Sequence, residues 1–204
     1  TIGFIHSMVP AFPINFLKRD GSPDELLLSG EAQLSLFIKY LNWKKENLKI
    51  IYSPRISKYI DKKNINSIFF PISIESKKII LHVLENYILS KKDKFFKNIN
   101  IKKHPSSLGN KEQNILKEDI TKLINNNKNK FNKKSNNTLN FFIGPTSAFI
   151  QYLENNQSCI HITTNPVFDV YTFGLWKKLF PKQINKYMYN YKLYDRNKMI
   201  LMKK

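Results

Sequence analysis

The chain has 204 residues, of which 42% are hydrophobic and 13% aromatic, a composition that fits a globular protein and excludes a disordered one. No apolar run approaches the roughly 20 residues of a membrane-spanning helix. The single cysteine, Cys159, excludes an internal disulfide and fits a reducing compartment. The net charge of +19 is compatible with an anionic substrate, an anionic membrane surface or nucleic acid, but abundant Lys, Asn and Ile are equally typical of an AT-rich genome.

The predicted elements alternate along the chain between short apolar runs and segments with apolar residues at helical spacing. The predicted strands are residues 2–6, 25–29, 48–52, 67–72, 98–103, 138–143 and 158–163, and the predicted helices are residues 31–43, 75–89, 112–125, 147–155 and 169–179. Loops are predicted at 7–23 and 126–137, and a basic, tyrosine-rich tail after 181. This alternation predicts an α/β fold, a Rossmann-like parallel sheet with helices on both faces.

In a parallel α/β sheet, ligands bind beyond the carboxyl ends of the strands. The residues that follow each predicted strand are therefore the candidates for a binding site. They are His6, Ser53, Pro54, Arg55, His104, Pro105, Gly144, Pro145, Thr146, Ser147, Thr163 and Thr164.

The strongest local signal is TLNFFIGPTSAFIQYL, in which a buried strand is followed by a turn and a helix. Gly144 permits a tight turn, and Thr146 or Ser147 is a suitable N-cap. Free N–H groups and hydroxyls at a helix N-terminus suit a phosphate. The alternative interpretation is an ordinary capped helix after a turn.

The second signal is NINIKKHP, in which Pro105 ends the strand and holds His104 at its carboxyl end. Lys102 and Lys103 point to alternate faces, so one of them is expected to reach the same site. An imidazole donates a hydrogen bond and a lysine supplies a point charge, which together suit a nucleotide phosphate. The alternative is a surface histidine at a strand end.

Other candidates are weaker by themselves. Arg55, in the turn Ser53-Pro54-Arg55, is of a residue type that binds a carboxylate or phosphate through two hydrogen bonds, but a surface arginine in a turn is the alternative. His6 is a further histidine at a strand end. His161 in an apolar strand and His82 on a helix are predicted to be core residues, and Cys159 to be a small buried hydrophobe.

The sequence lacks the common templates of other chemistries. It contains no GxGxxG, no P-loop, no GxSxG and no spacing typical of metal ligands. No paired carboxylates indicate glycosidase chemistry. No metal site is therefore predicted.

The order of these motifs along the strands resembles the nucleotide-binding half of GT-B glycosyltransferases. More narrowly, it resembles bacterial surface-carbohydrate (O-antigen and capsule) biosynthesis proteins, which are similar to polysialyl-, sialyl- and Kdo-transferases and to CDP-glycerol glycerophosphotransferases. The resemblance covers residues 2–178 with gaps. His104 and Pro105 match the His-Pro pair of that group, and Thr146 and Ser147 match its Ser/Thr pair at a helix start.

The resemblance implies a site for a nucleotide-activated donor, CMP- or CDP-linked, with no other cofactor. His104 would be the catalytic residue that, with Lys103, stabilises the leaving phosphate. The further donor-binding residues would be Ser53, Arg55, Pro105, Gly144, Pro145, Thr146 and Ser147, with His6 and Gln151 as additional contacts. Gln151 stands where relatives carry an acidic residue that reaches a ribose, so a carboxylate–ribose contact is not expected here.

The resemblance also implies a domain plan: residues 1–60 as the end of an N-terminal region, 61–180 as the nucleotide-sugar-binding domain, and 181–204 as the tail. A strand within three residues of Thr1 leads us to expect that a longer protein with an acceptor domain precedes it.

The predicted function is the donor-binding part of a glycosyltransferase in surface polysaccharide assembly. Its expected partners are a nucleotide sugar and a glycan or lipid-linked acceptor, and its expected place is the cytoplasm, including the inner membrane face. The alternatives are a CDP-glycerol-type transferase, a non-catalytic relative that serves as a binding subunit, and a basic nucleic-acid-binding module, which the even spread of lysine disfavours.

Overall fold

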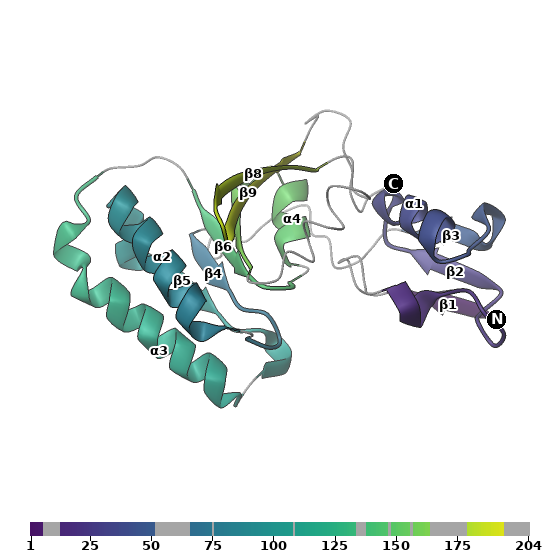
Figure 1. Ribbon diagram of the computed structural model, residues 1–204, viewed down its shortest axis with the longest axis horizontal. Coiled ribbons are helices and arrows are strands. Elements are labelled where there is room, and N and C mark those ends of the chain that lie inside the picture. The colour runs from purple at the N-terminus through teal and green to yellow at the C-terminus, as the bar shows by residue number, and fades with distance from the viewer. Residues whose placement is uncertain are drawn as a thin grey trace.

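The computed structural model describes residues 1–5, 13–51, 66–74, 76–107, 109–133, 138–146, 148–155, 157–163 and 179–193. These residues form two sheets, each with its own hydrophobic core. The smaller sheet has the strand order β1-β2-β3, and the larger has the order β5-β4-β6-β7-β9-β8 (Figure 1).

The smaller sheet comes from the first quarter of the chain. Strands β1 (Ile2–Phe4), β2 (Glu25–Leu28) and β3 (Leu48–Ile50) are parallel, and α1 (Glu31–Tyr40) connects β2 to β3. Alternate residues of β2 point to one face, where Leu26 and Leu28 pack in a buried cluster with Leu36 and Phe37 of α1. Short 3-10 helices, η1 (Pro13–Phe16) and η2 (Lys45–Asn47), complete this part.

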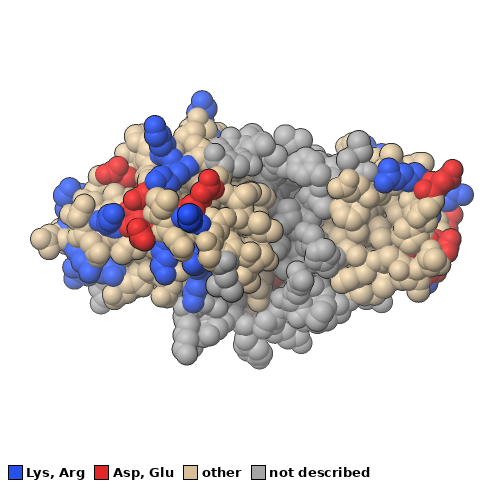
Figure 2. Space-filling model, turned by 90° about the horizontal axis from the view of Figure 1, so that it is seen from below, with Lys and Arg blue, Asp and Glu red and all other residues tan. Residues whose placement is uncertain are grey.

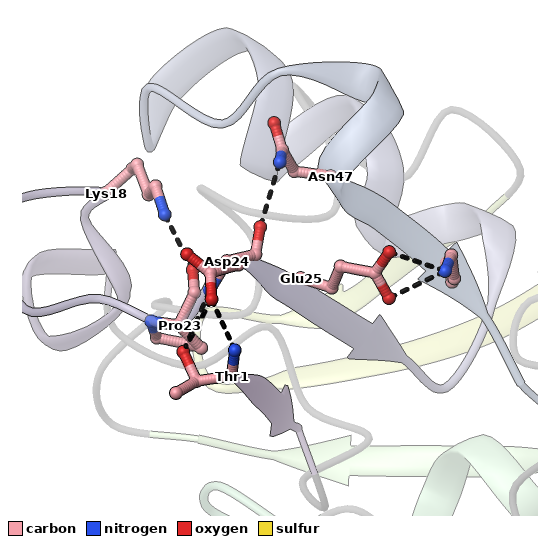
Figure 3. Close-up of polar contacts among 7 residues, drawn as sticks. Thr1, Lys18, Pro23, Asp24, Glu25 and Asn47 are labelled. Atoms are coloured by element: carbon pink, nitrogen blue, oxygen red, sulfur yellow. Dashed lines mark hydrogen bonds and ion pairs between the residues drawn. The ribbon is translucent and has the colours of Figure 1, made fainter.

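Polar contacts join the amino ends of these three strands (Figure 3). The amine and hydroxyl of Thr1 contact the carboxylate of Asp24, just before β2. Asn47 Nδ2 donates to the Asp24 carbonyl at 2.9 Å, and Lys49 Nζ lies 2.6 Å from the Glu25 carboxylate on the neighbouring strand. These contacts align the strands at the edge opposite to their carboxyl ends.

The larger sheet is built from βαβ units. Strands β4 (Ser67–Phe69), β5 (Asn100–Lys102), β6 (Asn140–Ile143) and β7 (Cys159–Ile162) are parallel, and α2 (Lys77–Lys91), α3 (Lys111–Asn126) and α4 (Ala148–Glu154) connect them in turn. The remaining 3-10 helices are η4 (Lys94–Asn98), η5 (Pro105–Ser107) and η6 (Lys128–Lys130). All four predicted helices that fall on described residues are present.

Helices cover both faces of the larger sheet, as predicted. On one face, Ile68, Phe141 and Ile160 share a buried cluster with apolar residues of α2 and α3. On the other face, the intervening residues meet the aromatic rings of α4: the ring centroids of Phe142 and Tyr152 lie 5.3 Å apart. Because successive strand residues point to opposite faces, both sides of β4, β6 and β7 are buried.

The sheet is mixed, because a hairpin adds an antiparallel edge that the sequence interpretation missed. Strands β8 (Leu179–Asn185) and β9 (Met188–Leu193) pair with each other, and β9 pairs antiparallel with β7. Residue 179 begins a strand where the end of a helix was expected. The hairpin strands, Leu179–Asn185 and Met188–Leu193, fall largely within the segment predicted as a tail, 181–204. Pro181 obscured β8 in the sequence, but an edge strand tolerates the missing N–H. Residues 169–178 of the predicted helix lie outside the described residues.

Within the described residues, no helix is both long enough and apolar enough to span a bilayer.

Candidate functional site

Three strand ends stand level at the carboxyl edge of the larger sheet. Phe69 of β4 pairs with the last residue of β5 on one side and with the third residue of β6 on the other. His104, Pro71 and Gly144 each follow two residues after these paired positions. Since neighbouring strands are about 4.8 Å apart, the ends of β5 and β6 lie roughly 10 Å apart, with the end of β4 between them.

The strand order reverses at this edge. The chain passes from β4 through α2 to β5, and then through α3 to β6 on the other side of β4. Open α/β sheets bind ligands at such a switch point, outside the carboxyl ends of the strands. The described fold therefore brings the two strongest sequence motifs to the edge where this architecture holds ligands.

His104 lies half-buried in the turn that follows β5. Its Nδ1 accepts a hydrogen bond from the backbone N–H of Ser106 at 3.2 Å, so a neutral ring carries its proton on Nε2. The backbone N–H and the hydroxyl of Ser107 lie 2.9 and 2.6 Å from the His104 carbonyl. The turn is thus fixed by local bonds, and the Nε2–H has no hydrogen-bond partner among the described residues.

Gln113, in the first turn of α3, links this turn to the end of β4. Its side chain is fully buried. Oε1 lies 2.6 Å from Ser107 Oγ, and Nε2 donates to the carbonyls of Pro71 at 2.6 Å and Ile72 at 3.0 Å. One amide therefore spans two loops that come from neighbouring strands.

Gly144 makes the turn after β6 in a conformation that favours glycine, with φ of +58°. A Cβ at this position would lie 3.3 Å from Pro71 Cγ, so the turn also packs closely on the end of β4. Its N–H donates to the Ile162 carbonyl at 2.8 Å. The predicted tight turn at Gly144 is confirmed.

His161 is buried in β7, as predicted, and its Nε2 donates to the Gly144 carbonyl at 2.9 Å. Burial lowers the pKa of the imidazole to about 4, against the smaller opposing effect of the bond to Gly144. The ring is therefore neutral at physiological pH. His161 braces the Gly144 turn from below, as a core residue.

The loop from β6 to α4 carries the remaining described candidates. Thr146 is buried, and its Oγ1 accepts a hydrogen bond from the Ala148 N–H at 3.4 Å, consistent with a role at the helix start. Pro145 is exposed, and Gln151 is half-buried on α4. Because α4 is only seven residues long, any anion binding here depends on the loop as well as on the helix dipole.

Lys103 does not converge with His104 in this structure. Its Nζ donates to Asn114 Oδ1 of α3 at 2.8 Å. The side chain lines an open cleft of about 470 Å³ along α3, whose other lining residues are Asn114, Lys117, Glu118, Thr121 and Lys122. Lys103 therefore lies at the cleft along α3, whereas His104 lies in the turn after β5.

Several predicted residues are outside this geometry. His6, Ser53, Pro54, Arg55, Ser147 and Thr164 lie outside the described residues.

The prediction that His82 is a core residue is wrong: His82 is exposed on α2 and bonds to Asn86. It stands roughly 200° around the helix from the buried Ile80, on the solvent side. Cys159 is fully buried as predicted, and burial raises the pKa of its thiol, so it is an inert packing residue.

Sequence reasoning missed Gln113, Ser107 and Pro71. The pattern Asn110-x-x-Gln113 was a usable signal, because it predicts a capping box at the start of a helix. The Asn110 side chain does accept from the Gln113 N–H at 3.2 Å. The Gln113 amide, however, bonds to the neighbouring loops, a long-range contact that no local pattern specifies.

No family model, curated protein or solved structure matches this chain. The described residues contain no group of three or more His, Cys, Asp or Glu side chains placed to hold a metal ion.

Proposed function

We propose that the carboxyl edge of the larger sheet binds the phosphate of a nucleotide-activated sugar. CMP is the simplest ligand with which to test this binding. In this proposal, the chain is the donor-binding part of a glycosyltransferase of surface polysaccharide assembly. The GT-B half-fold, the donor class and the biological setting rest on the motif resemblance. The location of the site rests on the geometry of the strand ends.

The observation that carries the proposal is the state of His104. The Ser106 N–H occupies Nδ1, which leaves a donor at Nε2, in a fixed turn at the switch point of the sheet. An N–H donor held in place before a ligand arrives stabilises negative charge without reorganisation. No described residue bonds to this donor, so it is open to a ligand phosphate.

The chemistry follows from where charge develops. In glycosyl transfer, the bond between the anomeric carbon and a phosphate oxygen breaks, and the acceptor hydroxyl forms a new bond to that carbon. Negative charge then builds on the departing phosphate. The Nε2–H of His104 and the polar groups of the loop at Gly144 and Thr146 would stabilise that charge. Lys103, held by Asn114, would contribute only through its wider electrostatic field.

The charge distribution offers less support for polynucleotide binding. On the face drawn in Figure 2, the described Lys and Arg side chains stand among Asp and Glu side chains, and they form no continuous basic track. On α3, Lys117 is followed directly by Glu118 and Asp119, and Asp119 is paired with Lys77 at 2.9 Å. Sequence-independent nucleic-acid binding requires clustered cations.

Calorimetric titration of the full chain with CMP, CDP, UDP and GDP tests the proposal. We expect saturable binding of at least one cytidine nucleotide with a weak dependence on salt concentration. Replacement His104→Ala should weaken that binding by about tenfold or more, the effect of losing one charge-assisted hydrogen bond.

His82→Ala is the matched control. It removes an exposed histidine of α2 that is not part of the proposed site, so the affinity should be unchanged. Equal affinity in His104→Ala and wild type would remove His104 from the site. Binding that favours single-stranded polynucleotides over all mononucleotides, and that falls steeply with salt, would support the nucleic-acid alternative.

A further inference from the structure

We infer that Gln113 is a positioning residue, whose side-chain amide sets the orientation of the His104 imidazole and the spacing of the two turns on either side of it. The inference rests on the proposed role of His104, but it adds a residue that belongs to neither sequence motif. Gln113 would touch no ligand and would act only through the loops that it joins.

Every polar group of the Gln113 amide is used at this edge. A glutamine amide offers one acceptor oxygen and two N–H donors. Here the oxygen contacts Ser107 Oγ at 2.6 Å, and the nitrogen donates to Pro71 O at 2.6 Å and Ile72 O at 3.0 Å. A carboxylate cannot supply the two donors, and an apolar side chain supplies neither type of group.

Gln113 is connected to the turns on both sides of it. The single proton of the Ser107 hydroxyl can be donated to Gln113 Oε1, while the Ser107 N–H bonds the His104 carbonyl at 2.9 Å, so Gln113 reaches the turn of His104 through Ser107. On the other side, the Pro71 ring packs against Gly144, whose turn begins the loop to Thr146. Gln113 is therefore the buried link between the two halves of the proposed phosphate site.

The Gln113 side chain is fully buried. Its bond to the Pro71 carbonyl is buried too, so water does not replace that bond when it is lost. Without the amide, the carbonyls of Pro71 and Ile72 lose their donor, and Ser107 Oγ keeps only the His104 carbonyl as an acceptor, so nothing ties the two turns to each other through this side chain. The Ser106 N–H bond that holds Nδ1 belongs to the same short turn, so the tautomer of His104 reports such a shift.

The experiment uses the full chain labelled with ¹⁵N, in wild type and in Gln113→Met, a replacement of similar length without polar groups. Ring-nitrogen spectra of His104 measure the tautomer, amide exchange measures protection of Ser107, and calorimetry measures affinity for CMP. In wild type we expect the Nε2–H tautomer. In Gln113→Met we expect a mixture of tautomers, faster exchange at Ser107 and about tenfold weaker binding of CMP.

Gln33→Met is the matched control. Gln33 is also fully buried, and its Oε1 accepts from the Ser29 N–H at 2.9 Å, but it lies on α1, which packs on the smaller sheet. It should lower stability without changing the His104 tautomer or CMP affinity. If Gln113→Met does not fold, Ser107→Ala removes the same link at its other end and should shift the tautomer in the same direction.

The outcomes are separable. A folded Gln113→Met protein with the wild-type tautomer and wild-type affinity would overturn the positioning role. The same would follow if Gln33→Met altered the His104 ring to the same extent. Absence of nucleotide binding by wild type would overturn the proposed function, while the tautomer and exchange measurements would still decide the role of Gln113.

Discussion

His161 Nε2 lies 2.9 Å from the carbonyl oxygen of Gly144, and this bond braces the turn after β6 from the neighbouring strand β7. Gln113 plays the corresponding part between the turns after β4 and β5. Two buried polar side chains therefore hold four strand ends in place at the carboxyl edge of the larger sheet. At this edge, the His104 Nε2–H has no hydrogen-bond partner among the described residues.

The burial of His161 makes stability depend on pH. The pKa of His161 falls from an ordinary 6.5 to about 4 in the folded protein. Between these two pH values, the unfolded chain binds a proton at this residue and the folded chain does not. The contribution is fully present above pH 6.5 and is lost as pH falls from 6.5 toward 4. Its full size is roughly 3 kcal/mol, since one pKa unit corresponds to about 1.36 kcal/mol. Urea unfolding at pH 7.5, 6, 5 and 4.5 measures it.

His161→Gln should flatten this dependence, because glutamine keeps an N–H donor for Gly144 but does not titrate. His82→Gln is the control and should keep the wild-type slope, since His82 is exposed. An unchanged slope in His161→Gln would mean that other groups dominate acid unfolding.

Gly144→Ala should destabilise the protein more than Gly21→Ala. Both glycines have positive φ, +58° and +83°, so both replacements strain the backbone by about 1–2 kcal/mol. Only at Gly144 would the new Cβ also press on Pro71, whereas Gly21 has open space around it. The difference between the two unfolding free energies isolates the contact with Pro71. Equal losses of unfolding free energy in the two variants would show that Pro71 moves away from the new Cβ without destabilising the protein.

Lys103→Met should weaken CMP binding by no more than about twofold, because its ammonium is bonded to Asn114 and acts on the site only through a screened field. Titration at low and physiological salt tests this, with Lys45→Met, in the 3-10 helix η2 that precedes β3, as the control for net charge. A tenfold loss would instead place the ammonium at the phosphate, as the KKHP motif alone predicts.

Tyr191→Ala should lower the unfolding free energy by about 3–5 kcal/mol, the range for truncating a large buried aromatic residue. Tyr191 is 1% exposed, and its ring lies 5.7 Å from Phe149 and 5.8 Å from His161. Tyr40→Ala, on the exposed surface of α1, should cost far less. Similar losses would mean that the β8–β9 hairpin is not an integral part of the sheet.

The parts of the fold that local sequence pattern determines were predictable. Leu116, Ile120 and Ile124 of α3 recur at helical spacing and are buried on one side. Apolar runs such as Asn140–Ile143 are buried on both faces, as a central parallel strand requires. The strand-end rule then placed His104 and Gly144 at one edge without any knowledge of side-chain contacts.

The rest depended on contacts between distant segments. The bond from Gln113 to Pro71 joins residues 42 positions apart, and nothing in the local pattern distinguishes it from a helix cap. The direction of Lys103 was set by Asn114 on the next helix. The hairpin was hidden because Pro181 and a turn without glycine interrupt the strand signal, although pairing with β7 stabilises it.

Chemical-shift mapping of the ¹⁵N-labelled full chain with CMP tests the central claim most directly. The account predicts that saturable shifts concentrate at the amides of His104, Ser106, Ser107, Ile72, Gly144 and Thr146, with the smaller sheet unaffected. It would be contradicted if CMP produced no saturable shifts at millimolar concentration, or if the shifts fell on the Lys103 cleft or the smaller sheet and left the carboxyl edge unchanged.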